Sequence, residues 1–309
     1  MRALVTTGKG DYGLELREVD PPEPTPNQAV VAVRAVSLNR GEVRRQIRGA
    51  PAGQVPGWDV AGTVAQPAAN GSGPPAGARV VGLVPSGAWA EQIAMDTALV
   101  APLPDEVSFE DASTLPVAGL TAVRALALGG FLLGARVLIT GAAGGVGRFA
   151  VQLAAMAGAD VVAIAGSPER AEGLPELGAS RVVIGDEDPG RDFDLILESV
   201  AGASLTRSLA AVARFGTVVF FGASSEESAT VDARWYGENT GARLYGLRLW
   251  EELARHQSGR RDLSLLARLV GEDRLDTQVS LTADWRDPLP ALEALMARRV
   301  RGKAVLTIS

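Results

Sequence analysis

The sequence predicts an α/β fold in two domains, one rich in short strands and one built on a doubly wound parallel sheet. Its 309 residues exceed the usual size of a single domain, and 47% hydrophobic residues suffice for a sizeable core. Short apolar runs between Pro- and Gly-rich turns occupy the first third of the chain. From Ala135 onward, apolar strands alternate with helical stretches, a pattern that predicts βαβ units and a parallel sheet.

The N-terminal part is expected to contain short strands that form a small barrel or sandwich. The apolar runs are AVVAVRAV (29–36), VAGTVA (60–65), ARVVGLV (78–84) and WAEQIAM (89–95). Turn-forming residues separate them, as in PPEPTPN (21–27), NGSGPPAG (70–77) and PSG (85–87). The pattern changes near Phe109, where the spacing of apolar residues becomes helical and Ser108 is a suitable N-cap.

The second part is expected to alternate strands and helices. The predicted strands are ARVLITG (135–141), DVVAIAG (160–166), RVVIG (181–185), FDLILESV (193–200) and GTVVFFG (216–222). The predicted helices are GRFAVQLAAMAG (147–158), PERAEGLPELG (168–178) and SLTRSLAAVA (204–213). The chain should end with two helices, at 263–272 and 290–299, and a terminal strand, KAVLTIS (303–309).

Composition argues against several classes of protein. The net charge of -6 does not favour a nucleic-acid groove or a membrane-binding patch. No apolar run is long enough to span a membrane, and MRALVTTGKG lacks the apolar core of a signal peptide, so a cytoplasmic protein is expected. The absence of Cys removes disulfides, thiolate catalysis and Cys-based metal sites.

The loop GAAGGVG (141–147) is the candidate phosphate-binding site. It lies between a predicted strand and a predicted helix, which is the context that a dinucleotide-binding loop requires. Gly144 would let the backbone approach a pyrophosphate, and Gly147 would let the helix pack closely. The cofactor-binding residues expected here are Ala143, Gly144, Gly145, Val146 and Gly147, whose N–H groups face the phosphates. The alternative is a tight turn without a ligand.

The end of the second predicted strand indicates which dinucleotide is bound. NAD sites usually have an acidic residue there for the ribose hydroxyls, but this chain has Gly166 and then Ser167. Ser167 and Arg170 would both contact a 2′-phosphate, so the sequence favours NADPH over NADH. Glu169 is unfavourable beside a phosphate. Ser167 also suits the N-cap of the following helix, and the two roles are compatible.

The chain resembles the medium-chain dehydrogenase/reductase superfamily, in particular its zinc-independent quinone oxidoreductase branch. The matching segments run from end to end: SLNRGEV (37–43), VPGWDVAGTV (55–64), ARVVGLV (78–84), LPVAGLTAVRAL (115–126), VLITGAAGGVGRFAVQLA (137–154), GSPERAEGLPELGA (166–179) and RGKAVLTIS (301–309). The resemblance implies a GroES-like β-barrel catalytic domain, residues 1–115 and 256–309, and a Rossmann domain, residues 116–255. It also places the active site in the cleft between the two.

The same resemblance indicates that no zinc is bound. Asn39, Trp58 and Val117 match the positions where zinc alcohol dehydrogenases of this superfamily carry Cys, His and Cys, and none of the three suits zinc. The single histidine, His256, lies in a charged segment and is expected to be exposed. Without a Lewis acid an alkoxide is hard to stabilise, whereas hydride addition to a conjugated acceptor gives a delocalised anion. The expected activity is therefore NADPH-dependent reduction of a quinone or an α,β-unsaturated carbonyl.

The residues of the active site are carried over from the resemblance. Asn39 would contact the substrate carbonyl or the nicotinamide carboxamide, unless it only shapes a turn. Arg40 is a candidate for the substrate oxygen or a phosphate. Trp58 would wall the pocket or fill the core. Asp59 would brace its loop.

The resemblance also implies cofactor contacts for Thr121, for Gly222 at a strand end and for Lys303. Lys303 would reach the cofactor or be solvated. One position departs from the family, because many NADPH-using relatives carry a Tyr where this chain has Gly185. No tyrosine lies in a motif that marks a proton donor, and bulk water would serve.

Two other functions are compatible with these motifs. The chain also resembles the enoylreductase domains of polyketide and fatty-acid synthases, which makes an enoyl-thioester reductase an alternative. Such a substrate would need a basic entrance for its pantetheine arm, which sequence alone does not place. A non-catalytic NADPH-binding module is the other alternative. Relatives commonly form homodimers through an edge strand, and RLYGLRL (243–249) is the candidate segment here.

Overall fold

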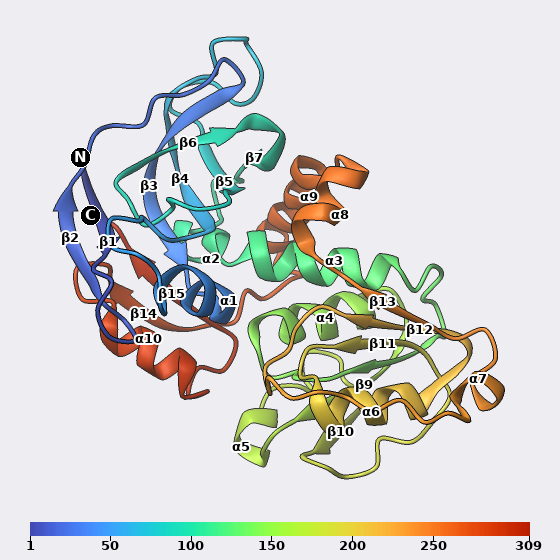
Figure 1. Cartoon of the computed structure of the whole chain (residues 1–309). Coiled ribbons are helices and arrows are strands. Elements are labelled where there is room, and N and C mark those ends of the chain that lie inside the picture. The colour runs from blue at the N-terminus through green and yellow to red at the C-terminus, as the bar shows by residue number, and fades with distance from the viewer. The chain divides into compact units, whose positions relative to one another are not determined.

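The computed structural model describes residues 1–309, which form two compact units (Figure 1). We call Met1–Leu120 with Gln257–Ser309 the β unit, and Thr121–His256 the α/β unit. The domain boundaries stated above remain a prediction about which segments fold independently. The two-part α/β fold class is confirmed, because a mainly antiparallel sheet lies in one unit and a parallel sheet in the other.

The β unit is organised around its longest strand, β3. Its larger sheet has seven strands, in the order β14-β15-β3-β4-β5-β7, with β6 also paired to β3. Their bounds are β3 (Gln28–Ser37), β4 (Asp59–Gln66), β5 (Arg79–Leu83), β6 (Gln92–Asp96), β7 (Val100–Pro102), β14 (Val279–Asp284) and β15 (Lys303–Thr307). β1 (Arg2–Thr6) and β2 (Leu14–Glu18) form a separate hairpin. Because Val305 of β15 pairs with Ser37 of β3, the C-terminal Lys303 lies close to the residues that follow β3.

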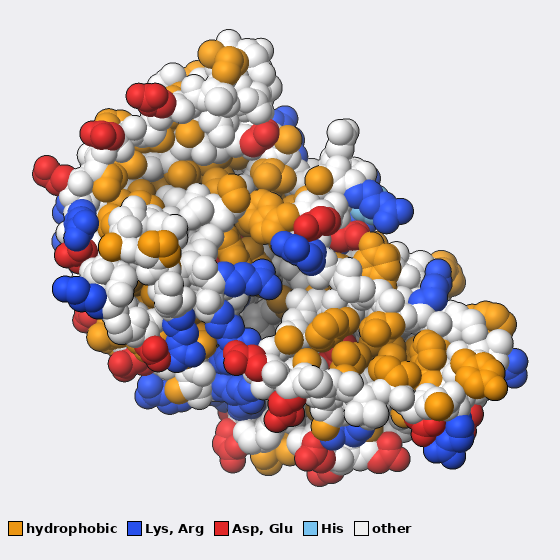
Figure 2. All heavy atoms as spheres, viewed as in Figure 1, with side chains coloured by type: hydrophobic (Ala, Val, Ile, Leu, Met, Phe, Trp, Pro, Cys, Tyr) orange, Lys and Arg blue, Asp and Glu red, His pale blue; other side chains and the backbone are white.

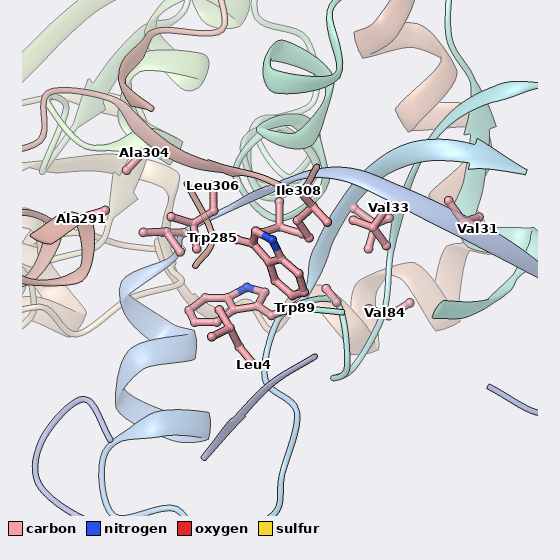
Figure 3. Close-up of a cluster of buried hydrophobic side chains, with 14 of the residues drawn as sticks. Leu4, Val31, Val33, Val84, Trp89, Trp285, Ala291, Ala304, Leu306 and Ile308 are labelled. Atoms are coloured by element: carbon pink, nitrogen blue, oxygen red, sulfur yellow. The ribbon is translucent and has the colours of Figure 1, made fainter. Parts of the chain in front are cut away.

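The core of the β unit contains two tryptophans with no exposed surface, Trp89 and Trp285. Figure 3 shows both indole rings within one cluster of aliphatic side chains from strands far apart in sequence. Gly57 lies against this cluster with a positive φ of 109°, and a Cβ there would be 2.2 Å from Cδ1 of Trp89. Only glycine fits both the backbone conformation and the space.

Short helical segments connect the strands of the β unit and position the candidate site. α1 (Arg40–Glu42) follows β3 and continues directly into the π-helical turn η1 (Val43–Ile47). A second π-helical turn, η3 (Leu115–Gly119), follows α2 (Phe109–Ser113), whose predicted N-cap Ser108 accepts a hydrogen bond from Asp111 N–H. The remaining helices are η2 (Thr97–Leu99), α9 (Gly259–Gly271) and α10 (Leu289–Met296).

The α/β unit has six parallel strands in the order β10-β9-β8-β11-β12-β13. Numbered from β8, this is the doubly wound order 3-2-1-4-5-6, so the predicted Rossmann topology is confirmed. The strands are β8 (Arg136–Ile139), β9 (Asp160–Ala165), β10 (Arg181–Ile184), β11 (Phe193–Glu198), β12 (Val212–Phe220) and β13 (Arg243–Gly246). The helices are α3 (Leu120–Ala127), α4 (Gly145–Met156), α5 (Pro168–Ala171), α6 (Gly202–Ala211), α7 (Trp235–Glu238) and α8 (Leu249–His256). No helix of the chain is both long and apolar enough to cross a membrane.

Several element predictions are wrong in their bounds, among them the helix expected over 290–299, which ends at Met296, and the strand expected over 243–249, which ends at Gly246. The helix expected over 168–178 ends at Ala171, because Gly173 has a positive φ of 82° and Pro175 has no N–H for a helical hydrogen bond. The strand expected over 89–95 spans Gln92–Asp96, since Trp89 turns into the core and its N–H binds Pro56 O. The helix expected to reach residue 213 ends at Ala211, where β12 begins.

Gly147 provides a test of how tightly α4 packs against the loop before it. A Cβ at Gly147 would lie 2.5 Å from Cα of Ala142, closer than real Cβ contacts. Gly147→Ala should therefore destabilise the α/β unit by about 1–3 kcal/mol in thermal or denaturant unfolding. Gly237→Ala in α7 is the control, because nothing lies within 4 Å of its Cβ. Equal stability of the two variants would contradict the close packing.

Candidate active site

Five polar residues of the β unit converge in its interior. Ser37 ends β3, Asn39 is the N-cap of α1, Glu42 ends α1, Asp59 begins β4 and Lys303 begins β15. Ser37, Glu42 and Asp59 have no exposed surface, Lys303 is 2% exposed, and Asn39 is half-buried. We call these five residues the polar centre. Asn39 is thus its one member that reaches toward the surface of the unit.

Asp59 is the hydrogen-bond acceptor around which the polar centre is arranged. Its Oδ2 accepts hydrogen bonds from the Ser37 hydroxyl and, at 2.8 Å, from Asn39 Nδ2. Its Oδ1 accepts one from the backbone N–H of Val117 at 2.9 Å, which ties η3 to β4. These bonds replace the water that the carboxylate loses by burial. Asp59 therefore braces more of the β unit than the single loop that its sequence position predicts.

Lys303 completes the centre from the C-terminal strand. Its ammonium Nζ donates to Asn39 Oδ1 at 2.8 Å and to Leu38 O at 3.3 Å, and lies 3.7 Å from Asp59 Oδ2. The alternative role expected for Lys303, that of a solvated side chain, is wrong. The carboxylate on one side and the ammonium on the other fix which way the Asn39 amide points, with nitrogen toward Asp59 and oxygen toward Lys303.

Glu42 is the member that the sequence analysis missed. Its carboxyl accepts hydrogen bonds from the N–H of Asn39 at 2.8 Å and of Trp58 at 2.6 Å, so it joins the start of α1 to the start of β4. Burial, together with the nearby charge of Asp59, raises the pKa of Glu42 to about 8. The spacing of Asn39 and Glu42 is that of a capping box, which is the signal that could have identified Glu42.

The charges of Asp59 and Lys303 affect the pKa of each other. Burial raises the pKa of the Asp59 carboxyl and lowers the pKa of the Lys303 ammonium, while each partially offsets the shift of the other. With Glu42 protonated, the Asp59–Lys303 pair makes the polar centre neutral. With Glu42 ionised, the centre carries one net negative charge.

The other two predicted catalytic residues lie beside the polar centre. Trp58 is 8% exposed and its ring packs on Gly41, since a Cβ at Gly41 would be 3.0 Å from Cη2 of the indole. Nη1 of Arg40 donates to the carbonyls of Leu295 and Met296, both at 3.1 Å, at the C-terminal end of α10. The Arg40 guanidinium is thus directed to the end of α10.

The positions that the resemblance matches with zinc ligands do meet at one place. Asn39, Trp58 and Val117 are all linked to the two carboxyls of the centre, through the Asn39 amide and the N–H groups of the other two. No group of three or more His, Cys, Asp and Glu side chains is placed to hold a metal ion. His256, at the end of α8, is 44% exposed beside Glu252, as expected for an exposed histidine.

The candidate nucleotide site of the α/β unit is formed by backbone. Gly141 has a positive φ of 59°, Gly144 is the N-cap of α4 without a side-chain cap, and Ala142 and Ala143 of the loop are buried. The first-turn N–H groups of Gly145, Val146 and Gly147 have no acceptor within the helix. A loop of glycines and buried alanines, followed by helix N–H groups without a helical acceptor, fits a pyrophosphate.

The end of β9 places the residues expected near a 2′-phosphate. Ser167 is the N-cap of α5, with its hydroxyl accepting from Arg170 N–H at 3.4 Å, so the structural alternative for Ser167 holds. A hydrogen bond from the same hydroxyl keeps the pKa of Glu169 below its ordinary value. A Cβ at Gly166 would lie 3.6 Å from Nη1 of Arg170, which places this guanidinium at the end of β9. The contact of Ser167 and Arg170 with a 2′-phosphate remains a prediction.

The remaining predicted contacts belong to the same unit. Gly222 follows β12, and a Cβ there would lie 3.0 Å from the carbonyl oxygen of Ser199 after β11, so the two strand ends approach closely. Thr121 is 6% exposed and lies in the first turn of α3. The functional roles of Gly222 and Thr121, like those of the other predicted site residues, remain predictions.

Two family models match the chain. The model described as an alcohol dehydrogenase GroES-like domain matches residues 25–105, and the one described as a zinc-binding dehydrogenase matches residues 145–251. Among curated proteins, the Streptomyces orinoci spectinabilin polyketide synthase protein NorB is 32% identical over 92% of this chain. The chain spans only 13% of NorB's length. The Solanum lycopersicum 2-methylene-furan-3-one reductase is 33% identical over 62% of this chain and 55% of its own length.

Solved structures match over the full length. The quinone oxidoreductase of Coxiella burnetii superposes with a TM-score of 0.87 and 26% identity, covering 100% of this chain and 99% of its own. Mycobacterial Rv1454c, whose structure is a complex with NADPH, superposes with a TM-score of 0.89 and 25% identity. The match covers 100% of this chain and 100% of that chain. Each of these proteins is similar to this chain along both of its units.

Glu42 should make the stability of the protein depend on pH. Its pKa is about 8 in the folded protein and 4.5 ordinarily, so the folded state binds more protons between these values. Stability should therefore decrease as the pH rises from 5 to 8, by at most about 1.4 kcal/mol per pH unit from this group. Glu42→Gln should flatten the dependence measured by urea unfolding at several pH values.

The matched control is Glu293→Gln, which changes an exposed carboxyl on α10. Its stability should follow the wild-type curve. Asp59 and Lys303 are present in all three proteins, so the difference isolates Glu42. Parallel curves for wild type and Glu42→Gln would show that the Glu42 carboxyl is ionised across this range.

Proposed function

The chain belongs to the medium-chain dehydrogenase/reductase superfamily, in its quinone-oxidoreductase-like branch, and we propose that it is an NADPH-dependent reductase of quinones or α,β-unsaturated carbonyl compounds that needs no metal ion. The observation that carries the proposal is the polar centre. At the positions matched with zinc ligands, it presents an oriented amide supported by a carboxylate and an ammonium. That arrangement suits hydrogen bonding to a carbonyl oxygen.

NADPH would be held by the α/β unit. The N–H groups of Gly145, Val146 and Gly147 would bind the pyrophosphate, and Arg170 the 2′-phosphate. When bound, NADPH supplies the hydride. The structure of mycobacterial Rv1454c with NADPH supports this choice of cofactor.

Asn39 would position the substrate and stabilise the anion that forms. One N–H of its Nδ2 is engaged by Asp59, which leaves the second N–H to donate to a substrate carbonyl oxygen. Hydride addition to the β-carbon turns the C=C–C=O unit into an enolate, and addition to a quinone gives a phenolate. In both cases the negative charge collects on the oxygen that Asn39 contacts. Water then supplies the proton that completes the reduction.

An enoyl-thioester reductase is the second candidate function. The observation that favours it is the match of nearly the whole chain to a region of polyketide synthases, 92% of the chain in NorB and 100% in a Mycobacterium tuberculosis mycocerosic acid synthase-like protein. The chemistry at the β-carbon is the same. Only the group attached to the carbonyl differs.

The proposal also includes a cytoplasmic homodimer acting on a small molecule. β13 (Arg243–Gly246) is the edge strand of the parallel sheet, with Leu244 48% exposed. An apolar edge strand favours pairing with an equivalent strand of a second copy.

The proposed function is tested by following NADPH and NADH oxidation at 340 nm with ortho-quinones, para-quinones and linear enones, with and without EDTA. We expect NADPH oxidation well above that of NADH, and no effect of EDTA. Inhibition by EDTA that added zinc reverses would contradict metal-free catalysis. No turnover with any acceptor, together with tight NADPH binding, would favour the non-catalytic alternative.

Arg170→Gln should change the choice of cofactor. Loss of one charged hydrogen bond to a phosphate costs about 1.5–3 kcal/mol, so the KM for NADPH should rise by roughly one to two decades. The KM for NADH should stay unchanged because NADH has no 2′-phosphate. Arg207→Gln is the control, since Arg207 forms an exposed ion pair with Asp186 at 2.8 Å in the same unit. Equal effects on the two cofactors would remove Arg170 from phosphate recognition.

A further inference from the structure

The helix α5, which carries Arg170, has few contacts of its own to hold it in place. It is a single turn of four residues, and its one buried side chain is the methyl group of Ala171. A helix this short is not stable by itself in water. At its N-terminal end, the Ser167 hydroxyl accepts a hydrogen bond from Arg170 N–H at 3.4 Å. Its C-terminal end needs a separate contact, because the chain turns away at Gly173 with a positive φ of 82°.

Arg148 supplies that contact from the first turn of α4. Its side chain is buried, with 4% of the residue exposed. Nη2 of Arg148 donates to Glu172 O at 2.7 Å and to Arg170 O at 3.4 Å. A Cβ at Gly173 would lie 3.3 Å from Nη1, so both ends of the guanidinium lie where α5 ends. A guanidinium suits this position because it carries several N–H donors in one rigid plane and can bind two carbonyls at once.

This contact joins the two parts of the candidate nucleotide site. Arg148 directly follows Gly147, whose N–H group is a candidate for the pyrophosphate. Its two acceptors belong to the end of α5, where a 2′-phosphate is expected, 22 and 24 residues further along the chain. One buried side chain therefore holds the segment after β9 against the helix that follows the glycine loop.

The orientation of α5 matters because acids lie on both sides of Arg170 in the sequence. Glu169 precedes it, Glu172 follows two residues later, and both acids are exposed. Successive residues of a helix point about 100° apart, so a rotation of α5 would exchange the guanidinium of Arg170 for the carboxylate of Glu169. Figure 2 shows acidic side chains on the part of the α/β unit where Figure 1 places α5 and β10. A phosphate would be attracted in one orientation of α5 and repelled in the other.

We propose that Arg148 is a positioning residue for the cofactor, which holds α5 so that Arg170 faces the 2′-phosphate and thereby sets the preference for NADPH over NADH. The proposal rests on the proposed function, and only on the NADPH-binding part of it. Arg148 does not have to touch the phosphate. Without its two hydrogen bonds α5 would lose its fixed position, and the ligand would have to order Arg170 on binding, at a cost in affinity.

Arg181 offers a comparison that separates positioning from stability alone. Its guanidinium also donates to two loop carbonyls, Pro189 O at 3.1 Å and Asp188 O at 2.9 Å. Arg181 begins β10, which is parallel to β9, so it lies at the edge of the sheet opposite to the strand ends where nucleotides bind. Its loss removes the same kind of contact at a distance from the candidate site.

The test compares Arg148→Met, which keeps much of the side-chain length without the N–H donors, with Arg181→Met as the matched control. Arg148→Lys is the second variant, since it keeps a charged donor in case the Met variant is too unstable to study. Binding of NADPH and NADH is measured by cofactor fluorescence without any acceptor. Calorimetry with 2′,5′-ADP and with AMP, which differ only in the 2′-phosphate, isolates this group. Thermal unfolding of every variant is recorded in the same buffer.

We expect the dissociation constant of NADPH to rise by about tenfold in Arg148→Met, as for a lost charged hydrogen bond, and that of NADH by less than about twofold. The affinity for 2′,5′-ADP should fall as much as that for NADPH, and the affinity for AMP as little as that for NADH. Arg148→Lys should lie between wild type and Arg148→Met, because an ammonium does not hold two carbonyls as a planar guanidinium does. Arg181→Met should keep the wild-type ratio of the two cofactors even where its melting temperature falls.

A double variant shows whether Arg148 acts through Arg170. If it does, adding Arg148→Met to Arg170→Gln should cause no further loss of NADPH affinity relative to NADH. Two independent phosphate contacts would give additive losses instead, and that result would overturn the positioning role.

Other outcomes would also overturn it. Equal losses for NADPH and NADH, or a lower melting temperature with an unchanged ratio, would leave Arg148 a purely structural residue. A wild-type ratio in Arg148→Lys would assign the effect to charge alone. These binding measurements need no acceptor, so they hold even if the protein reduces no quinone or enone. Wild-type protein that binds neither cofactor would refute the proposed function itself.

Discussion

The fold of the β unit depends on the hydrogen bonds and the cation that offset the cost of burying the Asp59 carboxylate. A charge with no exposed surface is strongly unfavourable unless it is paired and hydrogen-bonded, and breaking one such pair typically costs several kcal/mol. Asp59 meets this requirement through Ser37, Asn39 and Val117, with Lys303 as the nearby cation. These partners come from β3, η3 and β15, so the centre can form only when three distant parts of the chain have come together.

The α/β unit builds its candidate site in a different way. Its candidate phosphate-binding loop would use backbone N–H groups and glycines, which need a parallel sheet and a helix that begins after β8. The arrangement of β8, α4 and β9 is local in sequence, whereas the polar centre joins residue 39 to residue 303.

This difference explains how much of the protein could be predicted from its sequence. Alternating strands and helices predicted βαβ units and a parallel sheet, and the glycines predicted the loop, because both signals lie within short windows. Glu42 was missed and Lys303 was left between two roles, because the pairing of β15 with β3 has no signature in either segment alone. The predicted catalytic role of Arg40 did not account for the carbonyls of α10, which lie 255 and 256 residues away along the chain.

In the proposed reaction, the polar centre would also have to favour an anionic intermediate at a site that offers amide, indole and aliphatic residues. An enolate oxygen beside a net negative centre would be destabilised by like charge, which is strong where water is excluded. The Asp59–Lys303 pair is neutral by itself, so the net charge of the centre is decided by Glu42. Burial keeps that carboxyl protonated up to about pH 8. In the proposed reaction, the centre would therefore hold Asn39 between two charges and still present a neutral surface to the developing oxyanion.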